Sequence, residues 1–220
     1  AIDGFSTYYR FKQNMRDTEF AIIKPFENVQ RGSSFALFNT NRPGSEPSQR
    51  SHETPHWLQI VNIDDSTKIF TVKLYNSRGQ FISQESIAIP SFGRRDLQAG
   101  HINPGANQIG MVEVIPQDQS APYLAQLHAY ASDAALANDA GTFSYATGIT
   151  TRPGVNYQQF LPITSGAGGQ NWIVVANAGP TTATVDLTFS DNNGSSLGTR
   201  SIRLGPRAQH HICLLYTSPS

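Results

Sequence analysis

Two segments of this chain match one another at a constant spacing of 115 residues. The sequence Trp57-Leu58-Gln59-Ile60-Val61-Asn62 recurs as Trp172-Ile173-Val174-Val175-Ala176-Asn177. The same spacing relates four further pairs: Phe70 and Val185, Val72 and Leu187, Leu74 and Phe189, and Gly79 and Gly194. Self-similarity at a fixed spacing is typical of tandem structural units. We therefore expect one folding unit to occur twice in the chain.

Apolar residues in these segments alternate with polar ones. In residues 68–75, Phe70, Val72 and Leu74 share one face, and a threonine and a lysine separate them. Residues 183–189 have the same pattern. A strand of this kind buries one face and exposes the other, so a second sheet must cover its apolar side. The sequence thus predicts an all-β fold of antiparallel β-sandwiches.

Glycine-containing turns separate the predicted strands. Residues 76–79 and 191–194 each end in glycine, which fits a hairpin turn with a positive φ at that position. The strands expected after these turns, and two further strands expected only in the first unit, cover residues 81–89, 197–204, 109–115 and 124–130. Because the second unit lacks counterparts of the last two strands, residues 141–212 should present an unpaired sheet edge.

The expected units divide the chain into residues 1–138 and 139–212, and the second unit is incomplete. The first unit has an insertion near residues 40–56 with little apolar content, which we interpret as a long surface loop. Residues 120–137 fit either a helix, with a serine cap and a proline in its first turn, or a strand. We favour a strand over residues 123–130.

The two ends of the chain have features of their own. Residues 213–220, Cys-Leu-Leu-Tyr-Thr-Ser-Pro-Ser, resemble a translated sequencing adaptor, so we expect this tail to be non-native. The start of the chain, from Ala1 to Ser6, is similar to the junction from Ala137 to Ser144. That similarity fits either a unit preceding Ala1 or a processed secretory N-terminus.

Composition argues against several classes of function. The chain has 16 basic and 16 acidic residues and no Lys/Arg-rich run, so it lacks the electrostatic footprint of nucleic-acid binding. No apolar run approaches the roughly 20 residues that span a bilayer. Apart from Cys213 the sequence has no cysteine, which excludes a disulfide framework, thiol catalysis and a cysteine-ligated metal.

Three motifs resemble metal sites but fit structural roles better. His52-Glu53-Thr54-Pro55-His56 matches the H-E-x-x-H pattern of zinc proteases, yet its proline breaks the helix that this pattern requires. His210 and His211 are adjacent, so on a strand they point to opposite faces. Asp191-Asn192-Asn193-Gly194 lacks the further ligands of a calcium loop and indicates a hairpin turn. We predict no metal, no cofactor and no catalytic residue.

Three other groups have a functional and a structural interpretation. Arg95, Asp96 and His101 could form a small site, although a strand end with solvated charges is more ordinary. Trp57 and Trp172 could stack on sugars, but their matching positions at the start of core strands favour buried packing. The glycine-rich residues 165–169 lack the lysine of a phosphate loop and indicate a flexible turn.

The chain resembles tandem immunoglobulin-like β-sandwich repeats of bacterial secreted and surface proteins. The residues that carry the resemblance run from Phe160-Leu161-Pro162 through Trp172 and Asn193-Gly194 to Leu204-Gly205-Pro206, and from Trp57 to Pro90 in the first unit. The resemblance implies a non-catalytic structural or adhesive module of a larger protein, outside the cell or in the cell envelope. Its partners would be neighbouring repeats of the same chain, surface glycans or proteins.

The alternative function is a carbohydrate-binding module appended to a hydrolase. An exposed line of Trp57, Tyr75 or Tyr130 would favour sugar binding, whereas buried tryptophans would favour a spacer. An enzyme is the third hypothesis, and its best candidate residues are Asp96 and His101.

Overall fold

The computed structural model describes residues 5–11, 18–25, 29–39, 56–97, 108–132, 143–155 and 172–213. Every regular element in these ranges is a strand, which confirms the prediction of an all-β fold. The strands are β1 (Phe5–Phe11), β2 (Thr18–Pro25), β3 (Ser34–Asn39), β4 (His56–Asn62), β5 (Lys68–Asn76), β6 (Phe81–Ile89), β7 (Arg94–Leu97), β8 (Ile109–Pro116), β9 (Tyr123–Ser132), β10 (Phe143–Thr150), β11 (Trp172–Ala176), β12 (Ala183–Ser190), β13 (Ser196–Leu204) and β14 (Gln209–Cys213). In this part of the chain, no helix has the length and apolar character needed to cross a membrane.

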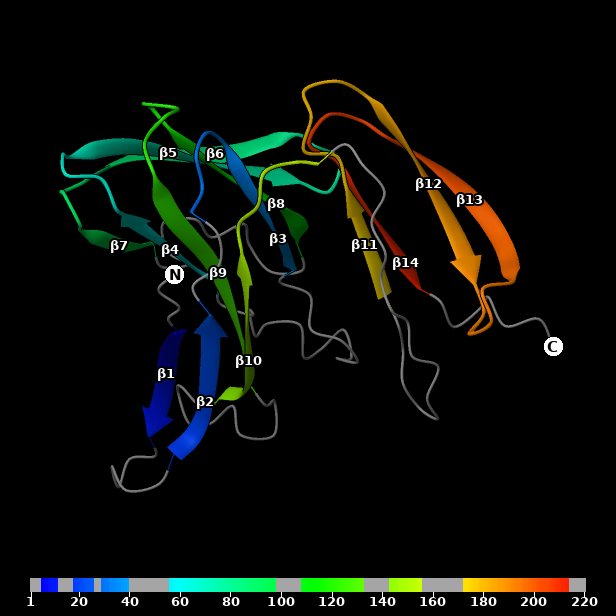
Figure 1. Cartoon of the computed structure of the whole chain (residues 1–220), viewed down its shortest axis with the longest axis horizontal. Helices are drawn as coiled ribbons and strands as arrows, with labels where there is room; N and C mark the ends of the chain where they lie inside the picture. Colours follow the sequence, from blue (N-terminus) through cyan, green and yellow to red (C-terminus); the bar gives the residue numbers. More distant parts are fainter. Residues whose placement is uncertain are drawn as a thin grey trace.

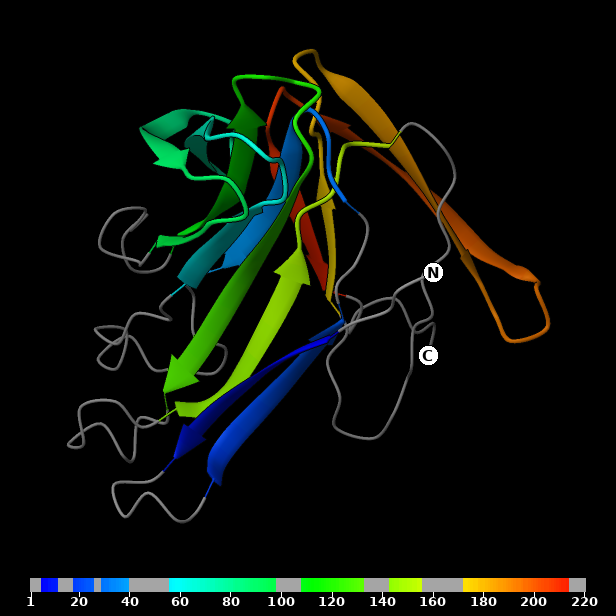
Figure 2. The ribbon, with the colours of Figure 1, turned by 60° about the vertical axis from the view of Figure 1, so that its left-hand side comes forward.

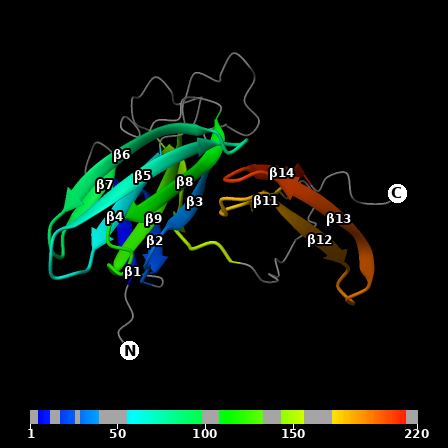
Figure 3. The same ribbon diagram turned by 90° about the horizontal axis from the view of Figure 1, so that it is seen from above.

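Eight strands form two four-stranded antiparallel sheets, which we call the first sandwich (Figures 1 and 3). One sheet has the order β10-β9-β4-β7 and the other the order β3-β8-β5-β6. The strands of each sheet alternate inward and outward side chains, so the inward apolar residues of both sheets meet in one core. β1 and β2 form a separate hairpin, and β2 lies beside β10 (Figure 2).

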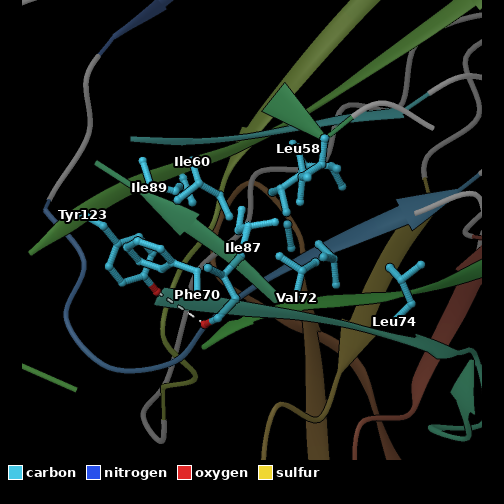
Figure 4. Close-up of a cluster of buried hydrophobic side chains, with 14 of the residues drawn as sticks. Leu58, Ile60, Phe70, Val72, Leu74, Ile87, Ile89 and Tyr123 are labelled. Atoms are coloured by element: carbon cyan, nitrogen blue, oxygen red, sulfur yellow. Dashed lines mark hydrogen bonds between the residues drawn. The ribbon is translucent and has the colours of Figure 1, made fainter. Parts of the chain in front are cut away.

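The core of the first sandwich draws on both sheets (Figure 4). β5 contributes Phe70, Val72 and Leu74, which are fully or almost fully buried. Tyr123 of the opposite sheet packs edge-on against Phe70, with 5.3 Å between ring centroids. Its hydroxyl donates toward Ser34 Oγ at 2.7 Å, and burial raises the pKa of Tyr123 to about 12. The phenol is therefore a neutral donor inside an apolar core.

The described strands of the second unit are β11 to β14, residues 172–213, and they form two two-stranded sheets, β11-β14 and β12-β13. Their small core contains Ile173, Ile202, Leu204 and Ile212. The inward residues of β12 are only partly buried, whereas their counterparts in β5 are in the closed core of the first sandwich. The difference arises from the number of neighbouring strands. β5 pairs with β8 as well as β6, and β4 pairs with β9 as well as β7, whereas β12 and β11 each pair with one described strand.

The strand starts and the hairpin register of β5 to β7 recur in β12 to β14. The 115-residue spacing seen in the sequence also separates the first residues of equivalent strands. It relates Lys68 of β5 to Ala183 of β12, Phe81 of β6 to Ser196 of β13, and Arg94 of β7 to Gln209 of β14. Cross-strand register is kept, since Phe70 pairs with Ile87 and Val185 with Ile202. Each hairpin also has an irregularity at the same place, after Leu74 and after Phe189.

One buried asparagine holds the same loop in each unit. Nδ2 of Asn62 lies within hydrogen-bond distance of the carbonyl oxygens of Ser66 (2.8 Å), Ile89 (3.0 Å) and Pro90 (3.0 Å), and its Oδ1 accepts from the Asp64 N–H (3.0 Å). In the same way, Nδ2 of Asn177 lies near the carbonyl oxygens of Thr181 (2.7 Å), Leu204 (3.3 Å) and Gly205 (2.9 Å), and its Oδ1 accepts from the Gly179 N–H (2.9 Å). The matching asparagines therefore perform the same structural task.

The structure settles several sequence predictions. The expected strands over 109–115 and 124–130 are β8 and β9, so the helical alternative is wrong for residues 123–132. The expected unit boundary at residues 138–139 does not follow the sheet pairing, because β10 pairs with β9 of the first sandwich. After β10, Arg152 also exchanges backbone hydrogen bonds with Phe35 of β3. The expected loop near residues 40–56 lies almost entirely outside the described residues.

Candidate functional site at the contact between the two units

The two units meet where one turn sits on another. The turn Gly205–Ala208 connects β13 and β14, and we call it the docking turn. It lies against the turn Asn76–Gly79 between β5 and β6, the receiving turn. The Gln209 N–H donates to Ser77 O at 2.9 Å, and Arg78 and Ala208 form an antiparallel β-bridge. The second unit is thus joined to the first sandwich by backbone pairing.

Arg207 is the central side chain of this contact. Its guanidinium donates to both carboxylate oxygens of Glu113 in β8, at 2.9 Å from Nη2 and 3.3 Å from Nε. The Glu113 side chain is 4% exposed and that of Arg207 is 19% exposed. A carboxylate that is buried to this extent requires a charged or hydrogen-bonding partner. The guanidinium of arginine provides two N–H groups that can pair with both carboxylate oxygens at once.

Two aromatic rings also lie beside the Arg207 side chain, and together with Glu113 they form what we call the seat of Arg207. The guanidinium carbon lies 4.9 Å from the ring centroid of Phe35 and 6.0 Å from that of Tyr75, which is within cation–π range. The Tyr75 hydroxyl donates to Glu113 Oε2 at 2.9 Å. Burial, together with the neighbouring carboxylate, raises the pKa of Tyr75, so the phenol stays protonated as a donor.

The receiving turn accommodates the docking turn only because it contains Gly79. A Cβ atom at this residue would lie 1.9 Å from the carbonyl oxygen of Pro206. Gly79 also has a φ of 79°, which glycine adopts without steric cost. Both the backbone conformation and the close approach therefore require glycine here.

Sequence reasoning missed this contact. Glu113 lies in an apolar run and alternates with residues that face the core, so the pattern alone places it in solvent. Arg207 follows a Gly-Pro pair and looks like an ordinary charged turn residue. Gly79 is the one sequence signal of this contact, but a glycine is also expected there from the hairpin turn, so it does not reveal that another turn packs against it.

Asp96 has hydrogen-bond partners on its own strand and on the neighbouring strand β4. It accepts a hydrogen bond from Arg94 Nη2 at 2.9 Å and one from Gln59 Nε2 at 3.2 Å. Arg95 is exposed, and His101 lies outside the described residues. The proximity of Asp96 and His101 is therefore not among the features that the structure describes, and their role as a catalytic pair stays a prediction.

The histidines of the sequence motifs lie on strands. His56 is the first residue of β4, so it is not on the helix that the zinc-protease motif requires, and residues 52–55 are outside the described ranges. His210 is exposed and His211 half-buried on β14. Burial, and secondarily the charge of His210, lowers the pKa of His211, which favours its neutral form. Within the described residues, no three His, Cys, Asp or Glu side chains cluster as a metal site.

The turn Asp191–Gly194 is a hairpin turn whose aspartate caps its own backbone. Asp191 Oδ1 accepts from the N–H groups of Asn193 at 2.9 Å and Ser195 at 2.8 Å. Asn76 makes the equivalent bonds to Arg78 and Gln80 in the receiving turn, at 2.9 Å and 3.0 Å. Gly194 has a φ of 83°, as the hairpin interpretation requires.

The prediction that Trp57 is buried in the core is wrong. Leu58 and Ile60 of β4 face the core, so the alternation of the strand turns Trp57 to the outer face, where it is half-buried. Gln126 and His128 of β9 lie on the same outer face and are themselves buried. The side chains of Trp172 and Tyr130, and residues 165–169, are outside the described part of the structure.

Comparison with known proteins found no matching family model and no matching curated protein. Solved structures match over part of the chain, including the following two. The crystal structure of Thermotoga maritima 1070 is 10% identical, with a TM-score of 0.40, and the match covers 56% of this chain and 94% of that one. The Anabaena sensory rhodopsin transducer is 12% identical, with a TM-score of 0.34 and coverage of 46% and 98%. At these values the likeness carries no argument about this chain.

Proposed function

We propose that the chain is a non-catalytic structural or adhesive module, built from tandem immunoglobulin-like sandwich units, of a larger secreted or cell-surface bacterial protein. The observation that carries the proposal is the docking turn, which seats Arg207 of one unit on Glu113 of the other. A flexible tether between independent domains would not require a buried ion pair at their contact. A fixed contact suits a unit that transmits position or force along an array.

The recurring backbone geometry supports the same proposal. Asn177 donates to the Gly205 carbonyl at the start of the docking turn, and Asn62 donates to the Pro90 carbonyl at the start of the equivalent turn in the first sandwich. The same bond therefore holds both turns. A unit that presents the same turn each time can be stacked repeatedly in one direction. Neighbouring repeats of the same chain are therefore the partners that this geometry suits best, and placement outside the cell follows from the resemblance.

A carbohydrate-binding module remains the second candidate, and one observation favours it. Trp57 faces outward from the first sandwich, as a sugar-stacking residue would. Its same-face neighbours Gln126 and His128 are buried, however, which leaves little polar area for sugar hydroxyls. Glycan binding that is lost in Trp57→Ala, with the fold intact, would establish this function in place of the structural one.

A matched pair of glycine substitutions tests the proposed function. Gly79→Ala should lower the free energy of unfolding by about 3 kcal/mol, because it adds backbone strain and pushes the docking turn away. Gly194→Ala has the same strain at a φ of 83°, but nothing lies within 4 Å of its Cβ, so its loss should be about 1 kcal/mol. Urea unfolding measures both values.

Hydrogen exchange on the same variants shows where stability is lost. Gly79→Ala should expose the amides of β11–β14 to exchange while the first sandwich stays protected. Equal losses in the two variants, or unchanged exchange in β11–β14, would show that the contact does not hold the units together, and the proposal of a fixed array would fail.

A further inference from the structure

The docking turn has an equivalent in the first sandwich, the turn Pro90–Gly93 between β6 and β7, which we call the exposed turn. The Gly93 N–H donates to Pro90 O at 2.9 Å, and the Ala208 N–H donates to Gly205 O at 3.2 Å. The third residue of each turn has a positive φ, 53° at Phe92 and 58° at Arg207. The exposed turn therefore presents the same backbone surface that the docking turn uses.

Phe92 differs from Arg207 in having no seat. It is 72% exposed, whereas Arg207 lies between two aromatic rings and Glu113. A bulky residue with a positive φ is uncommon and strained by about 1–3 kcal/mol. At Arg207 the same backbone conformation places the side chain in its seat. At Phe92 it holds a large apolar ring out in solvent, where the ring gains no packing.

The receiving turn also has an open equivalent, the hairpin turn Asp191–Gly194. Gly79 and Gly194 have nearly the same φ, but the Cβ position of Gly79 is filled by Pro206 O, and nothing lies within 4 Å of that of Gly194. Leu197, 63% exposed, follows this hairpin turn and supplies apolar surface near it. The hairpin turn 191–194 is thus an unoccupied version of the receiving turn.

These two open surfaces lie at opposite ends of the molecule. The connection from β6 to β7 is at the end away from β11–β14, and the β12–β13 turn is at the other extremity (Figures 1 and 3). We propose that a second copy of this chain docks its exposed turn, led by Phe92, onto the hairpin turn 191–194. Such a contact uses different surfaces on the two copies, so it generates head-to-tail assemblies.

This inference rests on the proposed function, since it extends the contact within one chain to a contact between copies. The two can fail separately. Gly79→Ala reports on the contact within the chain at any protein concentration, whereas docking of a second copy appears only as self-association that depends on concentration.

Sedimentation velocity over a range of concentrations tests the proposal on the full chain. We expect Phe92→Asn to weaken self-association at least about tenfold, because it removes the apolar anchor while asparagine tolerates the positive φ. Gly194→Asn should weaken it to a similar extent by blocking the other surface. Ile69→Thr, which removes a different exposed apolar side chain of the first sandwich, should associate like the unmodified chain.

Mixing the two weakened variants gives the decisive result. Each keeps one working surface, so an equimolar mixture should form a one-to-one complex that grows no further. A chain that stays monomeric at every concentration, association unchanged by Phe92→Asn, or two weakened variants that do not complement one another would each overturn the proposal. If Phe92→Asn does not fold, Phe92→Gly serves in its place, because glycine also adopts this φ.

Discussion

Replacing Arg207 by alanine should destabilise the chain by about 3 kcal/mol, which is as large as any effect we expect from a single substitution. Among the described residues, the variant leaves the buried Glu113 carboxylate with the Tyr75 hydroxyl as its side-chain donor. A buried charge without its counter-charge is costly because the site has lost water and gains no compensating attraction. Removal of the guanidinium also exposes the faces of the two aromatic rings that it covers.

Urea unfolding followed by tryptophan fluorescence measures this loss. Adding Glu113→Gln to Arg207→Ala should recover most of it, because an amide needs no counter-charge. Arg203→Ala is the matched control, since Arg203 is an exposed arginine on β13, and its effect should stay within about 0.5 kcal/mol. A similar small effect for Arg207→Ala would mean that the ion pair does not hold the units.

Asn62→Ala should destabilise the first sandwich by a comparable amount, about 3 kcal/mol. Asn62 is fully buried, and its amide serves three carbonyl oxygens and one N–H group of the loops around it. Alanine leaves these groups without partners in a place that water does not reach. Asn62→Asp should be as harmful, because a carboxylate cannot donate to the three carbonyls.

Asn177→Ala tests whether the same bonds matter equally in the second unit. We expect a smaller loss, about 1 kcal/mol, because the second unit has a thinner core and water can replace the lost partner. Thermal and urea unfolding of both variants give the comparison. Equal losses at the two sites would show that the second unit is as well enclosed as the first sandwich, contrary to the partial burial of β12.

Part of the strand set was predictable, most clearly β5 and β12, which alternate apolar and polar residues and are followed by a glycine-containing turn. The sequence analysis did not identify β1, β2, β3 or β10. The spacing between Trp57 and Trp172 also located equivalent backbone positions correctly, down to the two asparagines. Side-chain environment was less predictable. Trp57 matches Trp172 in sequence, yet the alternation that buries Leu58 turns Trp57 outward, which a pattern of tryptophan followed by apolar residues does not reveal.

The candidate site could not be predicted because it depends on a contact between distant parts of the chain. Glu113 and Arg207 are 94 residues apart, and nothing local distinguishes Arg207 from an exposed turn residue. The equivalent residue Phe92 shows the limit of repeat matching, since equal backbone geometry accompanies opposite exposure. The pairing of β10 with β9 was missed for the same reason, because sequence similarity located the repeat but not its sheet neighbours.

A disulfide across the contact tests the central claim, that the docking turn sits on the receiving turn. Arg78 and Ala208 face one another in an antiparallel bridge, where Cα atoms lie about 4.5 Å apart, within the range of a disulfide. With Cys213 replaced by serine, Arg78→Cys/Ala208→Cys should form an intramolecular disulfide in the native protein under mild oxidation. Asn193→Cys/Ala208→Cys, which uses the other hairpin turn, should not. Free thiols in the first pair, or disulfides only between molecules, would contradict the account.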